Sequence, residues 1–175
     1  MSFPVDRNFL SKIFQKIDQD KSGSIDSLEL QRALSNGTWK PFNLQTVNLL
    51  ISMFDRKKVD SIDFEEFIFV WQYVCSWQQT FRQYDSDNSG SIDRKELKLA
   101  ITTFGYSLSD QFFNILLNKF DRQKKNQIYF DDFIQCCVSL QMLTNMFKSK
   151  DQTGTGRINV GFEEFLTMIY SLNLS

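Results

Sequence analysis

Apolar segments with helical spacing alternate with polar loops five times along this 175-residue chain. Every loop opens with an aspartate and carries an isoleucine at its eighth position: Asp18 and Ile25, Asp55 and Ile62, Asp85 and Ile92, Asp121 and Ile128, and Asp151 and Ile158. The loops, called loops one to five, span residues 18–29, 55–66, 85–96, 121–132 and about 151–164. This recurrence predicts repeated helix–loop–helix units in which a short strand around each isoleucine pairs neighbouring loops.

Two of the four intervals between loops contain neither glycine nor proline, which predicts uninterrupted helices over Phe64–Tyr84 and Phe130–Lys150. Each is long enough for a helix of about 20 residues, roughly 30 Å, shared between two units. The other intervals contain turn signals: Gly37 and Pro41 in the first, and a C-capping Gly105 and an N-capping Ser109 in the second. The predicted fold is all-α, with about eight helices and short strands that pair the loops.

Loops one and three carry oxygen-bearing side chains at the positions that a 12-residue Ca²⁺-binding EF-hand loop uses, with Gly23 and Gly90 at the turn. The predicted ligands in loop one are Asp18, Asp20, Ser22, Ser24 through its carbonyl, Asp26 through water, and bidentate Glu29. Those in loop three are Asp85, Asp87, Ser89, Ser91, Asp93 and Glu96. A serine at position 5 lacks the charge of aspartate, so we expect a Kd on the order of 10⁻⁷–10⁻⁵ M. The alternative is two acidic turns that hold no metal.

Loops two and four depart from this ligand pattern. In loop two, Lys57 at position 3 would place a cation in the metal site, and Val59 supplies no side-chain oxygen at position 5. In loop four, Lys125 stands at position 5, and Asp132 is shorter than the usual glutamate at position 12. We therefore expect neither loop to bind Ca²⁺.

Loop five is stretched to about 14 residues, because the acidic residue that precedes an apolar one comes two places late, at Glu164. We expect no Ca²⁺ there at physiological levels; a weak site for Mg²⁺ or Ca²⁺ is the alternative. Units one to four can pair in twos, which leaves unit five without a partner. We expect a two-fold dimer in which unit five meets a copy through Ile158, Phe162 and Phe165. The alternative is a last helix that folds onto its own core.

Composition narrows the class of protein. The chain has 42% apolar and 23% charged residues and a net charge of −1, so it is globular and offers no basic field to nucleic acid. It has no histidine, no Gly-rich phosphate loop and no nucleophile elbow, so we do not expect an enzyme. Cys75, Cys136 and Cys137 do not suggest a disulfide framework, and we expect free, buried thiols. We see no signal peptide and no membrane-spanning run, and expect a soluble intracellular protein.

The alternating repeat spacing and the stretched fifth loop resemble the penta-EF-hand family over nearly the whole chain, read as a single domain of residues 1–175. One member in particular, whose first loop also has twelve residues, resembles the stretches ALSNGTWKPFN, ISMFDR, DNSGSID, FGYSLSDQF, KFDRQ and FDDFIQCC. Calpain small subunits and sorcin-like members are similar but have a longer first loop. This chain lacks that member's Gly/Pro/Ala-rich N-terminal tail, and has Ser107 where the member has an arginine.

The resemblance implies a Ca²⁺-dependent adaptor that dimerises through unit five, with its own copy or with another penta-EF-hand protein. It implies Pro-rich partners among trafficking proteins, namely Alix-like sorting scaffolds and COPII coat-like proteins of endoplasmic reticulum exit sites. It also implies a cytoplasmic location with peripheral association to endoplasmic reticulum and endosomal membranes, and the nucleus as a further compartment. The alternatives are a regulatory subunit of a calpain-like protease, a peflin-like heterodimer partner and a passive Ca²⁺ buffer.

Three aromatic residues flank loop three. Trp71 and Trp77 belong to the long helix predicted to enter the loop, and Phe104 ends the helix predicted to leave it. Aromatic grooves bind extended Pro-rich peptides, and Ca²⁺ draws Glu96 toward the ion and so re-aims the following helix. We hypothesise that Trp71, Trp77 and Phe104 line a peptide groove gated by loop three. The alternative is that they are ordinary core aromatics.

Overall fold

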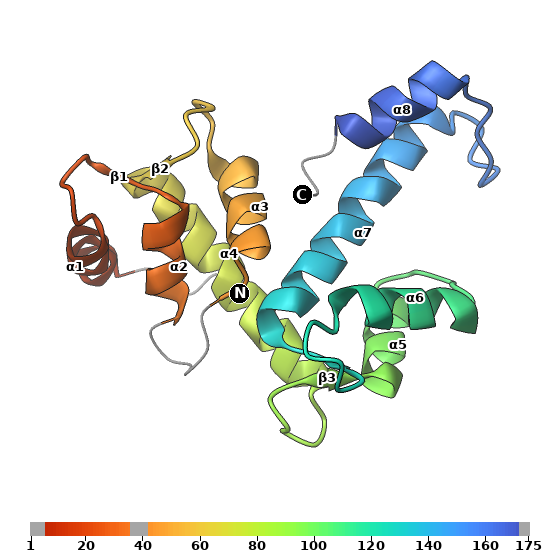
Figure 1. The fold of residues 1–175 in the computed structure, drawn as a ribbon, viewed down its shortest axis with the longest axis horizontal. Coiled ribbons are helices and arrows are strands. Elements are labelled where there is room, and N and C mark those ends of the chain that lie inside the picture. The colour runs from red at the N-terminus through yellow and green to blue at the C-terminus, as the bar shows by residue number, and fades with distance from the viewer. Residues whose placement is uncertain (1–5, 36–41, 172–175) are drawn as a thin grey trace.

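A computed structural model describes residues 6–35 and 42–171 of the chain (Figure 1). Within those ranges the elements are α1 (Arg7–Ile17), β1 (Ser24–Ile25), α2 (Ser27–Ser35), α3 (Leu44–Phe54), β2 (Ile62–Asp63), α4 (Phe64–Tyr84), β3 (Ile92–Asp93), α5 (Arg94–Thr103), α6 (Asp110–Phe120), β4 (Gln127–Ile128), α7 (Phe130–Lys150) and α8 (Phe162–Tyr170). The all-α prediction with short pairing strands is confirmed. The predicted break at Gly37 and Pro41 lies outside the described residues.

The isoleucines at position 8 pair the first four loops in twos. In the first pair β1 runs antiparallel to β2 with Ile25 opposite Ile62, and in the second β3 runs antiparallel to β4 with Ile92 opposite Ile128. All four side chains are fully buried, as expected for β-branched residues at the centre of each loop pair. Ile158 of loop five lies outside any of the strands of the described residues.

The two long helices begin and end where the sequence predicts. Both α4 and α7 have 21 residues and connect one unit to the next. At the start of α4, Asp63 and Glu66 form a capping box in which each side chain accepts from the other's backbone N–H. The same device, built from Asp93 and Glu96, starts α5. Positions 9 and 12 of these loops are therefore also the N-cap and third residue of the helix that follows.

Two cores lie along these shared helices. The first core packs α1–α4 and also contains Ile134 and Val138 of α7. The second packs the end of α4 with α5–α7, and Trp77 and Phe130 contact both cores. In Figure 1, α4 runs from β2 past the lower end of α3 to the start of α7, and contacts among α3, α4 and α7 join the two pairs of units. Burial of apolar side chains thus stabilises both pairs through the same two helices.

The linker between units three and four has the predicted caps. The helix α5 ends in a Schellman motif, in which Tyr106 and Gly105 donate their backbone N–H groups to the carbonyls of Ile101 and Thr102. Gly105 has φ of +93°, a conformation that glycine adopts without strain. Ser109 caps α6 by accepting from the Phe112 N–H at 3.2 Å. Both capping predictions are confirmed.

The three cysteines are free thiols, as predicted. Cys136 and Cys137 are buried in the second core, whereas Cys75 is only half-buried on α4. Burial raises the pKa of Cys136 to about 12. Its thiol is therefore neutral at physiological pH and packs as a small apolar side chain.

The C-terminal helix α8 has no buried side chain. Its apolar residues are exposed, including Phe162 at 77%, Phe165 at 48% and Ile169 at 41%. An ion pair of 2.7 Å between Lys150 and Glu164 joins α8 to the end of α7. Within the described ranges, no helix has both the length and the apolar character needed to cross a membrane.

Replacing Ile128 with alanine should lower the free energy of unfolding by about 3 kcal/mol, because it leaves a cavity at the centre of the second loop pair. Urea denaturation of the Ca²⁺-free protein measures this. The control is Val59→Ala in loop two, where the side chain is 61% exposed and a change within about 0.5 kcal/mol is expected. Equal losses in the two variants would contradict the pairing role of Ile128.

Candidate metal centres

Loop one is folded around its first aspartate. The backbone N–H groups of Ser22 and Gly23 donate to the two oxygens of Asp18, at 2.9 and 3.1 Å. Ser22 N–H also donates to Asp20 at 2.9 Å. Gly23 provides the turn with φ of +79°. As a result, carboxylate oxygens of Asp18, Asp20 and Glu29 lie within 4.8 Å of one another.

Loop three repeats this geometry. Asp85 accepts from the N–H groups of Ser89 and Gly90 at 2.9 and 3.0 Å, and carboxylate oxygens of Asp85, Asp87 and Glu96 also lie within 4.8 Å of one another. Hydrogen bonds from the Ser89 side chain and backbone lower the pKa of Asp87. Those from Ser22, the backbone first, lower the pKa of Asp20 in loop one. Both exposed aspartates are therefore ionised at neutral pH, as a hard divalent cation requires.

The serines at position 5 lie beside the carbonyls at position 7 in both loops. The hydroxyl of Ser22 donates to the Ser24 carbonyl at 2.9 Å, and that of Ser89 donates to the Ser91 carbonyl at 3.0 Å. These two oxygens per loop are the ligands expected from positions 5 and 7. Their contact brings both ligand positions to the same side of each loop.

The glutamates at position 12 are buried and held by backbone donors. Glu29 accepts from the N–H groups of Gln19 and Asp26, at 2.9 and 3.2 Å. Glu96 accepts from those of Ser86 and Asp93, at 2.8 and 3.0 Å. Glu29 and Glu96 are 7% and 9% exposed, and neither forms an ion pair with a described residue. A buried carboxylate without a cationic partner favours binding of a metal ion.

The aspartates at position 9 do not join the carboxylate clusters. Asp26 and Asp93 instead accept from backbone N–H groups of the following helix, Glu29 N–H at 2.8 Å and Glu96 N–H at 2.9 Å. This agrees with a ligand that acts through water, because a capping carboxylate is held away from direct contact with the ion.

Loop two keeps the shape of the site but contains its own cation. The ammonium of Lys57 lies 2.9 Å from Asp63 at position 9. Asp55 accepts from the N–H groups of Val59 and Asp60, and Asp60 takes the turn position with φ of +58° in place of glycine. A protein ammonium thus lies against an acidic position of this loop, which disfavours a second cation.

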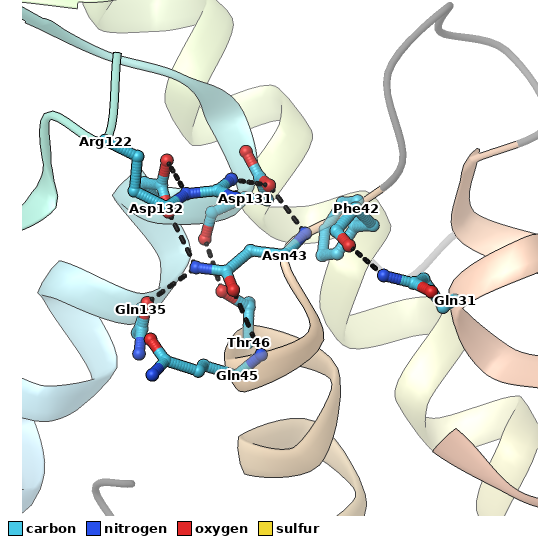
Figure 2. Close-up of polar contacts among 9 residues, drawn as sticks. All are labelled: Gln31, Phe42, Asn43, Gln45, Thr46, Arg122, Asp131, Asp132 and Gln135. Atoms are coloured by element: carbon cyan, nitrogen blue, oxygen red, sulfur yellow. Dashed lines mark hydrogen bonds and ion pairs between the residues drawn. The ribbon is translucent and has the colours of Figure 1, made fainter. Parts of the chain in front are cut away.

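Loop four pairs its position-12 carboxylate with an arginine of the same loop (Figure 2). Asp132 is 2% exposed and accepts from Nε of Arg122 at 2.7 and 2.8 Å, while Asp131 accepts from the same guanidinium at 2.6 Å. Burial raises the pKa of Asp132, and the hydrogen bond from Arg122 opposes that effect. The arginine at position 2 was not among the residues that sequence reasoning selected. The sequence feature that could have indicated this ion pair is the adjacent Asp131 and Asp132, about ten residues after Arg122 in a loop that lacks other metal ligands.

Loop five also pairs its late acid with a protein cation, since Glu164 bonds Lys150. Asp151 still accepts from Thr155 and Gly156 N–H, at 3.1 and 2.7 Å. Clusters of three carboxylates close enough to share an ion are found, among the described residues, in loops one and three.

The predicted aromatic groove is brought together only in part. Trp77 contacts Phe104 with ring centroids 6.3 Å apart, and Phe104 also contacts Tyr84, the residue before loop three, at 5.6 Å. Tyr73, which the sequence did not single out, extends this group by packing on Trp77 at 6.1 Å. Trp71 lies six residues earlier on α4 and packs on Phe67 at 5.9 Å; among the described residues it forms no ring contact with the other members of the group. Phe104 is 38% exposed and is the accessible member of the group.

Comparisons with known proteins agree with this geometry. A family model described as an EF-hand domain pair matches residues 7–72 and 75–138. The chain is 48% identical to sorcin of Schistosoma japonicum over 96% of this chain and 98% of the relative. It is 42% identical to human peflin over 90% of this chain, and spans 56% of peflin's own length.

Solved structures lead to the same group. The structure described as a homolog of programmed cell death 6 protein from Leishmania major Friedlin matches with a TM-score of 0.79 and 32% identity, over 95% of this chain and 94% of that chain. Programmed cell death 6 protein is also the family member that this sequence resembles in stretches such as FGYSLSDQF and FDDFIQCC. The family expectation is therefore confirmed.

Proposed function

This chain belongs to the penta-EF-hand family of Ca²⁺-binding proteins, and from that premise we propose that it is a two-site Ca²⁺ sensor that dimerises and captures Pro-rich segments of other proteins. The observation that carries the proposal is the pair of matching clusters in loops one and three, each with a buried glutamate that forms no ion pair with any residue in the described ranges. The other loops hold lysine or arginine against their acids. In these two loops Ca²⁺ would supply the positive charge that balances the clustered carboxylates.

The sensor works through helix α5. Glu96 belongs to the first turn of α5, and Phe104 follows its last turn. When Ca²⁺ draws the Glu96 carboxylate toward Asp85 and Asp87, α5 re-aims as one rigid element. Phe104 then shifts against Trp77 and Tyr84, which belong to α4 and stay in place. This motion opens an aromatic surface for an extended Pro-rich peptide.

Dimerisation follows from the exposed face of α8. Phe162, Phe165 and Ile169 are accessible in the single chain, and Ile158 has no strand partner within the described residues. A second unit five supplies a partner for both, either from a copy of this chain or from another penta-EF-hand protein. Relatives in this family include peflin, so a heterodimer is the second candidate.

On the strength of the family resemblance, we propose that this adaptor acts among trafficking proteins in the cytoplasm. The proposed partners are Pro-rich segments of Alix-like sorting scaffolds and of COPII coat-like proteins at endoplasmic reticulum exit sites. Membrane association would then be peripheral and mediated by these partners. A calpain-like regulatory role remains the competing assignment, and it requires unit five to prefer a different chain over its copy.

Calorimetric titration with Ca²⁺ should show two sites in the wild type and one in each of Glu29→Gln and Glu96→Gln. Glutamine preserves the capping interaction but removes the charge that the ion needs. Glu66→Gln is the matched control, because it changes the same position 12 in loop two and should leave two sites. A site lost in Glu66→Gln, or two sites kept in the other variants, would contradict the assignment.

Sedimentation of the pure protein should give a dimer, and Phe165→Asp should give a monomer with an unchanged helical circular dichroism spectrum. Aspartate puts a charge into an apolar interface that excludes water. The control is Phe112→Asp, at an aromatic that is 36% exposed on α6, away from unit five. Dissociation by both substitutions, or by neither, would argue against unit five as the dimer contact.

Fluorescence anisotropy with a labelled Pro-rich, Tyr-containing peptide should show binding only with Ca²⁺. Glu96→Gln should abolish this dependence, and Phe104→Ala should weaken binding about tenfold or more, as expected for an aromatic anchor. Phe112→Ala, outside the aromatic group, should bind like the wild type. Unchanged affinity in Glu96→Gln would exclude gating by loop three.

A further inference from the structure

A buried polar cluster connects the two pairs of EF-hand units where no metal is expected. Its members come from the start of α3 and from loop four with the start of α7, and are Asn43, Thr46, Arg122, Asp131, Asp132 and Gln135 (Figure 2). We call it the inter-pair cluster. Apart from Arg122, every member is at most 8% exposed. Its contacts span 85 to 92 residues of sequence between α3 and α7.

Asn43 is the centre of this cluster. Its backbone N–H donates to Asp131 at 2.7 Å, and its side-chain amide donates to Asp132 at 2.8 Å and to Gln135 at 3.0 Å. Its side-chain oxygen accepts from Gln45 N–H at 3.0 Å and so caps α3. Asn43 therefore donates hydrogen bonds to residues of α7 and accepts one from the first turn of α3.

A protein cation, Arg122, offsets part of the negative charge in the cluster. Arg122 bonds both carboxylates, at 2.6 Å for Asp131 and 2.7 Å for Asp132. The remaining negative charge lies at the N-terminal turn of α7 and against the N-cap of α3, where helix dipoles favour anions. Thr46 donates its hydroxyl to the Asp131 carbonyl at 3.1 Å. The donors of Arg122 and Asn43 satisfy the two carboxylates, whose burial would otherwise be costly.

We propose that the inter-pair cluster is a lock that joins α3 to α7 in both the Ca²⁺-free and the Ca²⁺-loaded protein. Arg122 gives the position-12 carboxylate of loop four the positive charge that Ca²⁺ gives in loops one and three. Because this charge is covalently part of the chain, the lock does not open when Ca²⁺ leaves. Phe42 and Phe130, with ring centroids 6.0 Å apart, back it with an apolar contact.

The lock gives the sensor a fixed frame. This inference rests on the function proposed above. The proposed motion of α5 and Phe104 requires other helices that stay in place while α5 moves. Loop four pairs with loop three through Ile92 and Ile128, so without a lock the strain at loop three would spread into α7. With α7 held to α3, Ca²⁺ moves α5 relative to α3, α4 and α7 together.

Pulsed electron–electron spin resonance tests the lock. Spin labels at Gln15→Cys on α1 and Asn118→Cys on α6, in a Cys75→Ser background, report the separation of the two pairs; both sites are exposed. Samples diluted with unlabelled protein exclude distances between chains. The distribution of distances between the two labels in the wild type should be narrow, with the same peak with and without Ca²⁺.

Asn43→Ser keeps an N-cap oxygen but loses the side-chain amide donors, and should broaden the distance distribution in both conditions. Arg122→Gln should do the same.

The matched control is Arg94→Gln, which makes the same change in an exposed ion pair with Asp110, and should leave the distribution unchanged. A wild-type peak that shifts with Ca²⁺ would overturn the proposal, and this comparison stands even if Arg122→Gln does not fold. So would folded Asn43→Ser protein with the wild-type distribution. Calorimetry on the labelled protein separates the two ideas: absent Ca²⁺ uptake contradicts the sensor, whereas broadening in Asn43→Ser without Ca²⁺ supports the lock alone.

Discussion

Each of the first four loops buries a carboxylate near its end, and the rest of the structure depends on how each loop stabilises that charge. Glu29, Glu66, Glu96 and Asp132, at position 12 of the first four loops, are all buried. A buried charge is costly unless it is paired or richly hydrogen-bonded. The backbone supplies two donors to each of the three glutamates through the same local geometry. What differs between the loops is the source of positive charge.

Each source assigns a role to its loop. Loop two places Lys57 against Asp63 and becomes a pairing partner for loop one. Loop four uses Arg122, and its two buried aspartates also accept hydrogen bonds from Asn43 at the start of α3, which makes this loop a structural joint. Loop five pairs Glu164 with Lys150 at the surface. In loops one and three, as in loop two, no described lysine or arginine forms an ion pair with the position-12 glutamate, but in loops one and three this glutamate also lies close to two aspartates, which is the arrangement on which the proposed Ca²⁺ sites rest.

The first four units and the fifth unit differ in how much apolar surface they bury. Four loops satisfy one another's strands through buried isoleucines, and the shared helices α4 and α7 join their cores. The fifth unit shares α7 but buries none of its own α8 side chains. The chain therefore combines two pairs of units that pack on each other with a last helix whose apolar face is exposed in the single chain, and the proposed dimer would cover that face.

Local chemistry determined much of this protein from sequence alone. Position-8 isoleucines predicted the strand pairs, the absence of glycine and proline predicted α4 and α7 to their end residues, and Gly105 and Ser109 predicted the caps. These features are readable because each depends on residues within one turn or one loop, where backbone conformation and ligand spacing are set by neighbours in sequence.

Only the tertiary structure decided which distant side chains meet. Trp77 met Phe104 and Tyr73, but not Trp71, because helical phase and the path of the linker set those contacts. Asn43 met Asp131 and Asp132 across about 90 residues, a pairing that leaves no periodic mark in either segment. The sequence by itself determined where acidic side chains gather in loops one and three, since the predicted ligands of a loop are near neighbours. The partners of Asp131 and Asp132 depend on how whole helices pack, so they are decided only when the chain is folded.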